Sequence, residues 1–201
     1  MMYTTAVIAI SYLLGSINPA VILSKFVYRE DIRTKGSGNP GATNAVRVFG
    51  KKFGLAVFGF DFAKGLLAVV AAKIIIGTTG VPYATILAAG FFAQLGHILP
   101  VFHGFRGGKG VATAVGAAFG VMPVTAAILL ILFGVILWAS GYVSLSSGIC
   151  AALYPLLAYF ISTSNRAENC IFAASCAMLI LLRHISNFER LNRGGEERIK
   201  W

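Results

Sequence analysis

The residues best suited to chemistry lie in one glycine-rich, basic segment, GHILPVFHGFRGGKGVAT, which runs from Gly96 to Thr113. Backbone N–H groups in such a turn can approach an anion closely, because glycine has no Cβ to block the way. Lys109 adds a point charge, and Arg106 adds a planar guanidinium that matches phosphate oxygens. The segment therefore predicts a phosphate-binding turn, although a basic loop that only holds helix ends at a membrane surface also fits. The residues assigned to the turn are Arg106, Gly107, Gly108, Lys109, Gly110 and Thr113.

The turn differs from the Walker A loop of nucleotide-binding proteins. In that motif Ser or Thr follows the lysine, whereas here Gly110 follows Lys109 and His103 occupies the position of the first glycine. A helix that starts near Val111 would direct its first N–H groups towards the same anion.

A second polar stretch, Val27–Lys52, is the longest in the chain. Its middle, SGNPGATN, consists of turn-forming residues. Thr43 or Asn44 could cap a short helix that displays Arg47 one turn later. Small hydroxyl and amide groups beside an arginine favour a second anion contact, and a solvated turn is the alternative. The residues assigned to this contact are Ser37, Asn39, Thr43, Asn44 and Arg47.

Two charged residues lie inside an apolar run, in the sequence FDFAKG. Asp61 and Lys64 share one face of a helix, so they can form an ion pair. A charge in a membrane span is costly unless it is paired or faces a polar cavity. The two residues therefore form a structural ion pair, or Lys64 faces a phosphate and Asp61 holds it there. His97, at the end of the next apolar run, is either a proton acceptor or a structural cap.

The C-terminal segment RHISNFERLNRGGEE places further polar groups on one helix face. His184 and Asn187 share that face, and Arg190 continues it. These side chains could bind or deprotonate a polar substrate, although an amphipathic interfacial helix with snorkelling arginines has the same pattern. Glu196 is expected to be a structural partner of an arginine.

The composition is that of a membrane protein with several spans. Of the 201 residues, 57% are hydrophobic and 12% are charged, whereas a soluble domain carries about 25% charged residues. A net charge of +10 would suggest nucleic acid in a soluble chain. Here the cations cluster between apolar runs, where the positive-inside rule and anionic lipid explain them. The three cysteines lack CxxC spacing and histidine neighbours, so we expect buried thiols, no metal and no cofactor.

The apolar runs predict an all-α fold that forms a single polytopic domain over residues 1–201. Runs of about twenty residues begin near Tyr3, Phe53 and Tyr83, and Pro19 is expected to kink the first. The loop Gly77–Pro82 has no basic residue and should be extracytoplasmic. The basic tail, which includes Arg183, Arg190, Arg193, Arg198 and Lys200, should be cytoplasmic.

The number of spans depends on the second half of the chain. The run Val111–Ser140 is too long for one relaxed helix, and we expect it to break at Gly120–Pro123. This break predicts about seven transmembrane helices, with the N-terminus extracytoplasmic and the C-terminus cytoplasmic. The alternative keeps five full spans and leaves Cys170–Leu182 as a re-entrant or interfacial helix.

Four segments, SGNPGATNAVR, FDFAKG, GHILPVFHGFRGGKGVAT and RHISNFERL, are thus expected on one side of the membrane. In this order and spacing the chain resembles the bacterial acyl-phosphate:glycerol-3-phosphate acyltransferases, the PlsY family, over nearly its whole length. In the third family motif Phe188 replaces an aliphatic residue, which is a mild departure.

The resemblance implies transfer of a fatty acyl group from acyl phosphate to the 1-hydroxyl of glycerol 3-phosphate, the first acylation step of phospholipid synthesis. It implies essential roles for Ser37 and Arg47, glycerol 3-phosphate binding by the glycine-rich turn, and roles for His184 and Asn187. Ser144 matches a family serine less firmly. The expected location is the bacterial cytoplasmic membrane, with the active site facing the cytoplasm. The expected partners are glycerol 3-phosphate, acyl phosphate and membrane lipid, without nucleic acid.

We expect direct transfer without an acyl-enzyme. Acyl phosphate is already activated, and neither Gly-x-Ser-x-Gly nor a Ser–His–Asp set is evident. His184 is the first candidate for the base, His97 is the second, and a phosphate oxygen of the donor could serve instead. A small transporter of an organic phosphate is the alternative function, and a non-catalytic scaffold is a third. Acyl chain-length preference and oligomeric state are left open.

Overall fold

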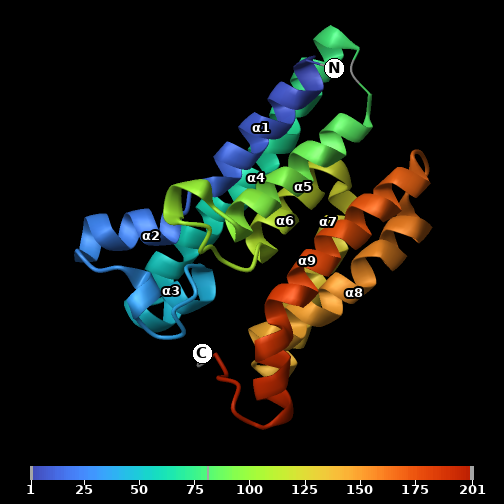
Figure 1. Ribbon diagram of the computed structural model, residues 1–201. Coiled ribbons are helices and arrows are strands. Elements are labelled where there is room, and N and C mark those ends of the chain that lie inside the picture. Colours follow the sequence, from blue (N-terminus) through green and yellow to red (C-terminus); the bar gives the residue numbers. More distant parts are fainter. Residues whose placement is uncertain (1, 81, 200–201) are drawn as a thin grey trace. The chain divides into compact units, whose positions relative to one another are not determined.

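The computed structural model describes residues 2–80 and 82–199, and every regular element within these ranges is helical. Val81 of the expected loop and Lys200 of the basic tail lie outside the described residues. The chain divides into two compact units, Met1–Val121 and Met122–Trp201. The two units are described in turn (Figure 1).

The first unit pairs long helices through small residues. Its α1 packs along α5, and its α4 packs along α6 (Figure 1). A side chain at Gly15 would overlap the carbonyl of Ala93, and one at Gly65 would overlap the carbonyl of Thr113. These glycines let the helix backbones approach closely, as is usual for helices in membranes. The elements are α1 (Met2–Ser16), α2 (Pro19–Leu23), the π-helical turn η1 (Ser24–Tyr28), the 3-10 turn η2 (Ile32–Thr34), α3 (Ala42–Phe49), α4 (Lys51–Thr79), α5 (Ala84–Ile98), the 3-10 turn η3 (Val101–His103) and α6 (Val111–Val121).

The first apolar run is broken between α1 and α2, next to the proline that predicted a kink. Asn18 caps α2, and its Oδ1 accepts the N–H of Val21 at 3.0 Å. In an unbroken helix that N–H would bond to the carbonyl of Ile17, four residues earlier. The break therefore leaves the Ile17 carbonyl available to another donor.

The second unit consists, within residues 122–199, of α7 (Pro123–Ser140), α8 (Val143–Ile161) and α9 (Arg166–Asn192). In this unit α8 packs against both α7 and α9 (Figure 1). The expected break of the long run is confirmed, because Met122 separates α6 from α7. Cys170–Leu182 belongs to α9, a continuous helix of 27 residues. It is therefore not a short re-entrant helix.

Six stretches in the described part of the chain are long and apolar enough to cross a bilayer. The short helix α6 has 11 residues, which at 1.5 Å per residue is roughly half of the ~30 Å hydrocarbon core. This helix is one of the seven predicted spans. The number of spans and the orientation of the termini both stay predictions. The six stretches are Met2–Tyr28, Lys51–Ile75, Ala84–His103, Pro123–Ser140, Val143–Ile161 and Arg166–Asn192.

Candidate functional site

The glycine-rich turn joins α5 to α6 in the first unit. Gly107, Gly108 and Gly110 are buried, Lys109 is half-buried, and Gly104 and Arg106 are exposed. Gly110 has a φ of +80°, a left-handed conformation that suits glycine. Helix α6 begins at Val111 as predicted, and the first N–H groups of a helix have no intrahelical acceptor. The hydroxyl of Thr113 is buried and has no hydrogen-bond partner in the described part of the chain.

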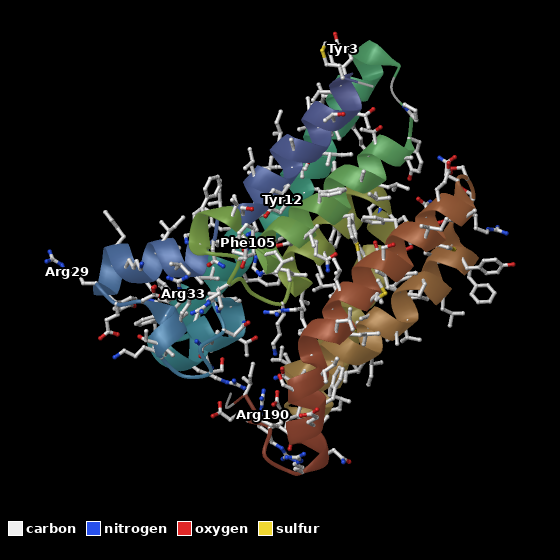
Figure 2. All side chains as sticks on the ribbon, viewed as in Figure 1. Tyr3, Tyr12, Arg29, Arg33, Phe105 and Arg190 are labelled. Atoms are coloured by element: carbon white, nitrogen blue, oxygen red, sulfur yellow. The ribbon has the colours of Figure 1, made fainter. Side chains whose placement is uncertain are left out.

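The turn is fixed to the helices beside it by direct contacts. The N–H of Gly108 donates to the carbonyl of His97 at 3.2 Å, and a side chain at Gly108 would overlap the imidazole of the same histidine. The hydroxyl of Tyr12, labelled in Figure 2, donates from α1 to the carbonyl of Leu99 at 2.7 Å. The end of α5 and the turn that follows it are thus held against each other and against α1.

Asn44 holds the polar segment in front of α3. Its Oδ1 accepts the N–H of Ser37 at 2.9 Å, and its Nδ2 donates to the carbonyls of Ile32 at 3.4 Å and Lys35 at 3.0 Å. The residue is 1% exposed. Both ends of the amide are used within the protein, so this geometry favours a structural role over the phosphate contact predicted for Asn44.

Helix α3 begins at Ala42 with Gly41 as its N-cap. The prediction that Thr43 or Asn44 caps this helix was therefore wrong. The side chain of Asn44 binds the preceding loop and lies inside the helix instead of at its start. Among the other residues predicted here, Arg47 and Ser37 are exposed, and Asn39 and Thr43 are half-buried.

Arg33, labelled in Figure 2, connects the polar segment to the glycine-rich turn. Its Nη1 donates to the carbonyl of His103 at 3.2 Å, and its Nη2 lies 2.7 Å from Oδ2 of Asp31. The hydrogen bonds from Arg33 outweigh the effect of burial and hold the pKa of Asp31 well below its ordinary value. No local sequence pattern predicts this role of Arg33, because the carbonyl it binds lies seventy residues away. The two segments predicted to contact anions are therefore joined within the first unit.

Asp61, Lys64 and His97 form one buried cluster on α4 and α5. Lys64 Nζ lies 2.8 Å from Asp61 Oδ1, 2.9 Å from His97 Nδ1 and 2.7 Å from the carbonyl oxygen of Ile17. His97 Nδ1 lies 3.0 Å from the same Asp61 oxygen. The side chains of Asp61 and Lys64 are only 2% and 6% exposed. Because the ammonium and the imidazole both make these buried contacts within the protein, the geometry favours a structural role for Lys64 and His97 over a phosphate contact and a base.

In the second unit, His184 is positioned by its own helix. Its Nδ1 lies 2.8 Å from the carbonyl oxygen of Ile180, one turn earlier in α9. A carbonyl only accepts hydrogen bonds, so Nδ1 carries the proton. In the neutral imidazole Nε2 then keeps its lone pair, which is the state that a proton acceptor needs.

Glu196 ties together the polar residues at the end of α9. Its Oε1 accepts from Asn187 Nδ2 at 2.7 Å, and its Oε2 accepts from Nε of Arg190, labelled in Figure 2, at 3.0 Å. Burial acts to raise the pKa of Glu196, but the interactions with Asn187, Ser144 and Arg190 outweigh it and lower that pKa. The buried hydroxyl of Ser144 makes no hydrogen bond of good geometry within the described residues.

A family model described as glycerol-3-phosphate acyltransferase matches residues 5–194. The chain belongs to this family. The glycerol-3-phosphate acyltransferase of Neisseria gonorrhoeae (strain NCCP11945) is 40% identical to it over 199 residues, which cover 98% of each chain. The glycerol-3-phosphate acyltransferase of Thermoanaerobacter pseudethanolicus is 39% identical, and the alignment covers 98% of this chain and 96% of the relative.

Crystal structures of PlsY (YgiH), an integral membrane glycerol 3-phosphate acyltransferase, resemble the chain with 35% identity. The alignments cover 98% of this chain and 96% of PlsY, with TM-scores of 0.89 for the glycerol 3-phosphate form and 0.84 for the lysophosphatidic acid form. The resemblance to the PlsY family is therefore confirmed, and the chain is a multi-pass membrane glycerol-3-phosphate acyltransferase.

Replacing Glu196 by Gln should make the second unit less stable at neutral pH and less sensitive to acid. A lowered pKa in the folded state means that the carboxylate stabilises the fold above its ordinary pKa, and that this contribution is lost as the pH falls through the lowered value. Glu196→Gln keeps an acceptor for Asn187 but removes the charge that faces Arg190. We expect a loss of about 1 kcal/mol in the free energy of unfolding, measured by thermal unfolding in detergent at neutral pH and at about pH 3.

The matched control is Glu189→Gln, an exposed carboxylate on the same helix. It should change neither the stability nor its pH dependence. Equal losses in the two variants would show that the Glu196 carboxylate does not hold this end of α9.

Proposed function

We propose that this acyltransferase uses acyl phosphate as its donor and transfers the acyl group directly to the 1-hydroxyl of glycerol 3-phosphate. The observation that carries the proposal is the glycine-rich turn, where buried glycines surround Lys109 and α6 begins. Backbone N–H groups, a helix N-terminus and cations together favour phosphate. Arg33 joins this turn to the segment that holds Arg47, so the first unit has cations for more than one phosphate group.

The reaction exchanges one bond for another at the acyl carbon. The hydroxyl oxygen of glycerol 3-phosphate attacks the carbonyl carbon, and the new ester bond forms. The bond from that carbon to the phosphate oxygen breaks, and phosphate leaves with the electron pair. Because phosphate is a good leaving group, the protein mainly orients the hydroxyl and stabilises the developing negative charge.

We assign the roles from the motifs that the chain shares with the family and, for His184 and Asn187, from their contacts in the second unit. Lys109 and the glycines hold the phosphate of glycerol 3-phosphate, and Ser37 and Arg47 hold the donor. The hydroxyl proton passes to Nε2 of His184, whose Nδ1 is bound to the Ile180 carbonyl. Asn187 is oriented by Glu196. A phosphate oxygen of the donor is the other candidate for the proton acceptor.

The remaining substrate contacts are assigned to polar groups that the fold buries. The hydroxyls of Thr113 and Ser144 are buried and have no hydrogen bond of good geometry to the described residues, so each can bind a polar substrate atom. We place the enzyme in the bacterial cytoplasmic membrane with its site facing the cytoplasm, because the cations of the first polar segment and of the tail follow the positive-inside rule. Membership in an acyltransferase family leaves the organic-phosphate transporter without support.

The donor and the direct transfer can be tested on purified protein in lipid vesicles. With acyl phosphate and glycerol 3-phosphate, we expect phosphate and lysophosphatidic acid in equal amounts, and no product with an acyl thioester as donor. With a labelled acyl phosphate and no acceptor, the denatured protein should carry no label, because no acyl-enzyme forms. Ser37→Ala and Arg47→Ala should fold and lose activity. Turnover with the thioester, or label on the protein, would contradict the proposal.

Replacing His184 by Asn should separate its role as a base from its role in α9. The Asn amide can still donate near the position of Nδ1, but it has no basic nitrogen at the position of Nε2. We expect the kcat with acyl phosphate to fall by about 10²–10⁴-fold, as when a general base is removed, with little change in the unfolding temperature. His103→Asn is the control, and its kcat should stay close to that of the wild type. A wild-type rate in His184→Asn would assign the proton to the donor phosphate.

A further inference from the structure

The structure assigns a positioning role to the buried cluster of Asp61, Lys64 and His97: the cluster sets the geometry of the glycine-rich turn that binds glycerol 3-phosphate. This inference rests on the proposed function of the turn. None of the three side chains needs to touch the substrate. They act through Gly108, which is in direct contact with His97.

The cluster joins three parts of the first unit through one ammonium group. Lys64 on α4 donates to Asp61 on the same helix and to the carbonyl of Ile17, and its Nζ lies 2.9 Å from Nδ1 of His97 on α5. That carbonyl is available because Asn18 takes over the N–H that would otherwise bind it. One side chain therefore links α5 to α4 and to the break after α1, in addition to the packing of α1 along α5.

The end of α5 carries this constraint to the turn. The carbonyl of His97 accepts the N–H of Gly108 at 3.2 Å, and the imidazole fills the space that a side chain at Gly108 would need. Gly108 is not among the glycines with positive φ. Glycine is required there by the closeness of the ring, since the backbone conformation would accept other residues.

The ring of His97 lies between the ion pair and Gly108. Its Nδ1 is 2.9 Å from Nζ of Lys64 and 3.0 Å from Oδ1 of Asp61. Of the ring atoms, Nε2 is the one nearest to the position of a side chain at Gly108. One edge of the ring therefore contacts the buried ion pair, and Nε2 faces the phosphate-binding turn.

A neutral replacement of the ion pair distinguishes positioning from direct phosphate binding. Lys64→Gln leaves the Asp61 carboxylate buried without its cation, and it should raise the KM for glycerol 3-phosphate at least tenfold, with a smaller change in kcat and none in the KM for the donor. The double variant Asp61→Asn/Lys64→Gln removes both charges but keeps groups that can hydrogen-bond. We expect it to recover a KM within about threefold of the wild type. If Lys64 binds phosphate, the double variant has lost that cation and stays as weak as Lys64→Gln.

The contact between Gly108 and His97 is tested by a double-mutant cycle. Gly108→Ala should raise the KM for glycerol 3-phosphate, because its Cβ would meet the imidazole. His97→Asn keeps a group that can hydrogen-bond near the position of Nδ1 and removes the part of the ring that faces Gly108. The fold increase in KM that Gly108→Ala causes should therefore be at least fivefold smaller in the His97→Asn background. If the fold increases in KM of the two single variants multiply in the double variant, the ring does not set the position of the turn.

Lys73→Gln is the matched control, because it removes an exposed lysine from the same helix, and its KM should equal that of the wild type. Equilibrium binding of glycerol 3-phosphate without any acyl donor is measured for every variant. This measurement tests the positioning role of the cluster even if acyl phosphate is not the donor. If the wild type turns over acyl phosphate but the double variant does not recover binding of glycerol 3-phosphate, the positioning role of the cluster is wrong and the proposed function still stands.

Discussion

A lysine ammonium buried in a membrane protein is costly unless the protein supplies polar partners, because the surrounding hydrocarbon offers none. Nζ of Lys64 lies within hydrogen-bond distance of a carboxylate, an imidazole and a backbone carbonyl. The carbonyl exists as an acceptor only because the first apolar run is broken at Asn18. The break next to Pro19, the ion pair on α4 and the histidine at the end of α5 are therefore parts of one arrangement.

Among the cations of the first unit, two connect helices and loops, and three lie in the segments that we propose to bind phosphate. Lys64 and Arg33 are held by acceptors of the protein itself, and they fix helices and loops to one another. Lys109, Arg106 and Arg47 lie on the turn and on α3, where they are half-buried or exposed. A site for a phosphorylated substrate needs both groups, since a cation can only be aimed if the backbone that carries it is fixed.

Helix breaks that depend on single residues could be predicted from the sequence. Roles that depend on contacts with residues distant in the sequence could not. The breaks next to Pro19 and at Met122 follow from single residues, and the order of four motifs was enough to identify the family. Asn44 was taken for a phosphate contact and a cap, because nothing local shows that its amide binds three backbone groups in front of α3. The partner of Lys64 on the broken helix lies 47 residues away, so no spacing rule could have revealed it.

We propose that the glycine-rich turn holds the phosphate of glycerol 3-phosphate, and calorimetric titration of the purified protein measures this binding without any donor. Lys109→Ala should weaken the binding of glycerol 3-phosphate at least tenfold, which corresponds to about 1.4 kcal/mol, while Lys73→Ala should bind as the wild type does. Inorganic phosphate should compete for the same site in the wild type. An unchanged dissociation constant in Lys109→Ala would place the phosphate elsewhere and contradict the account.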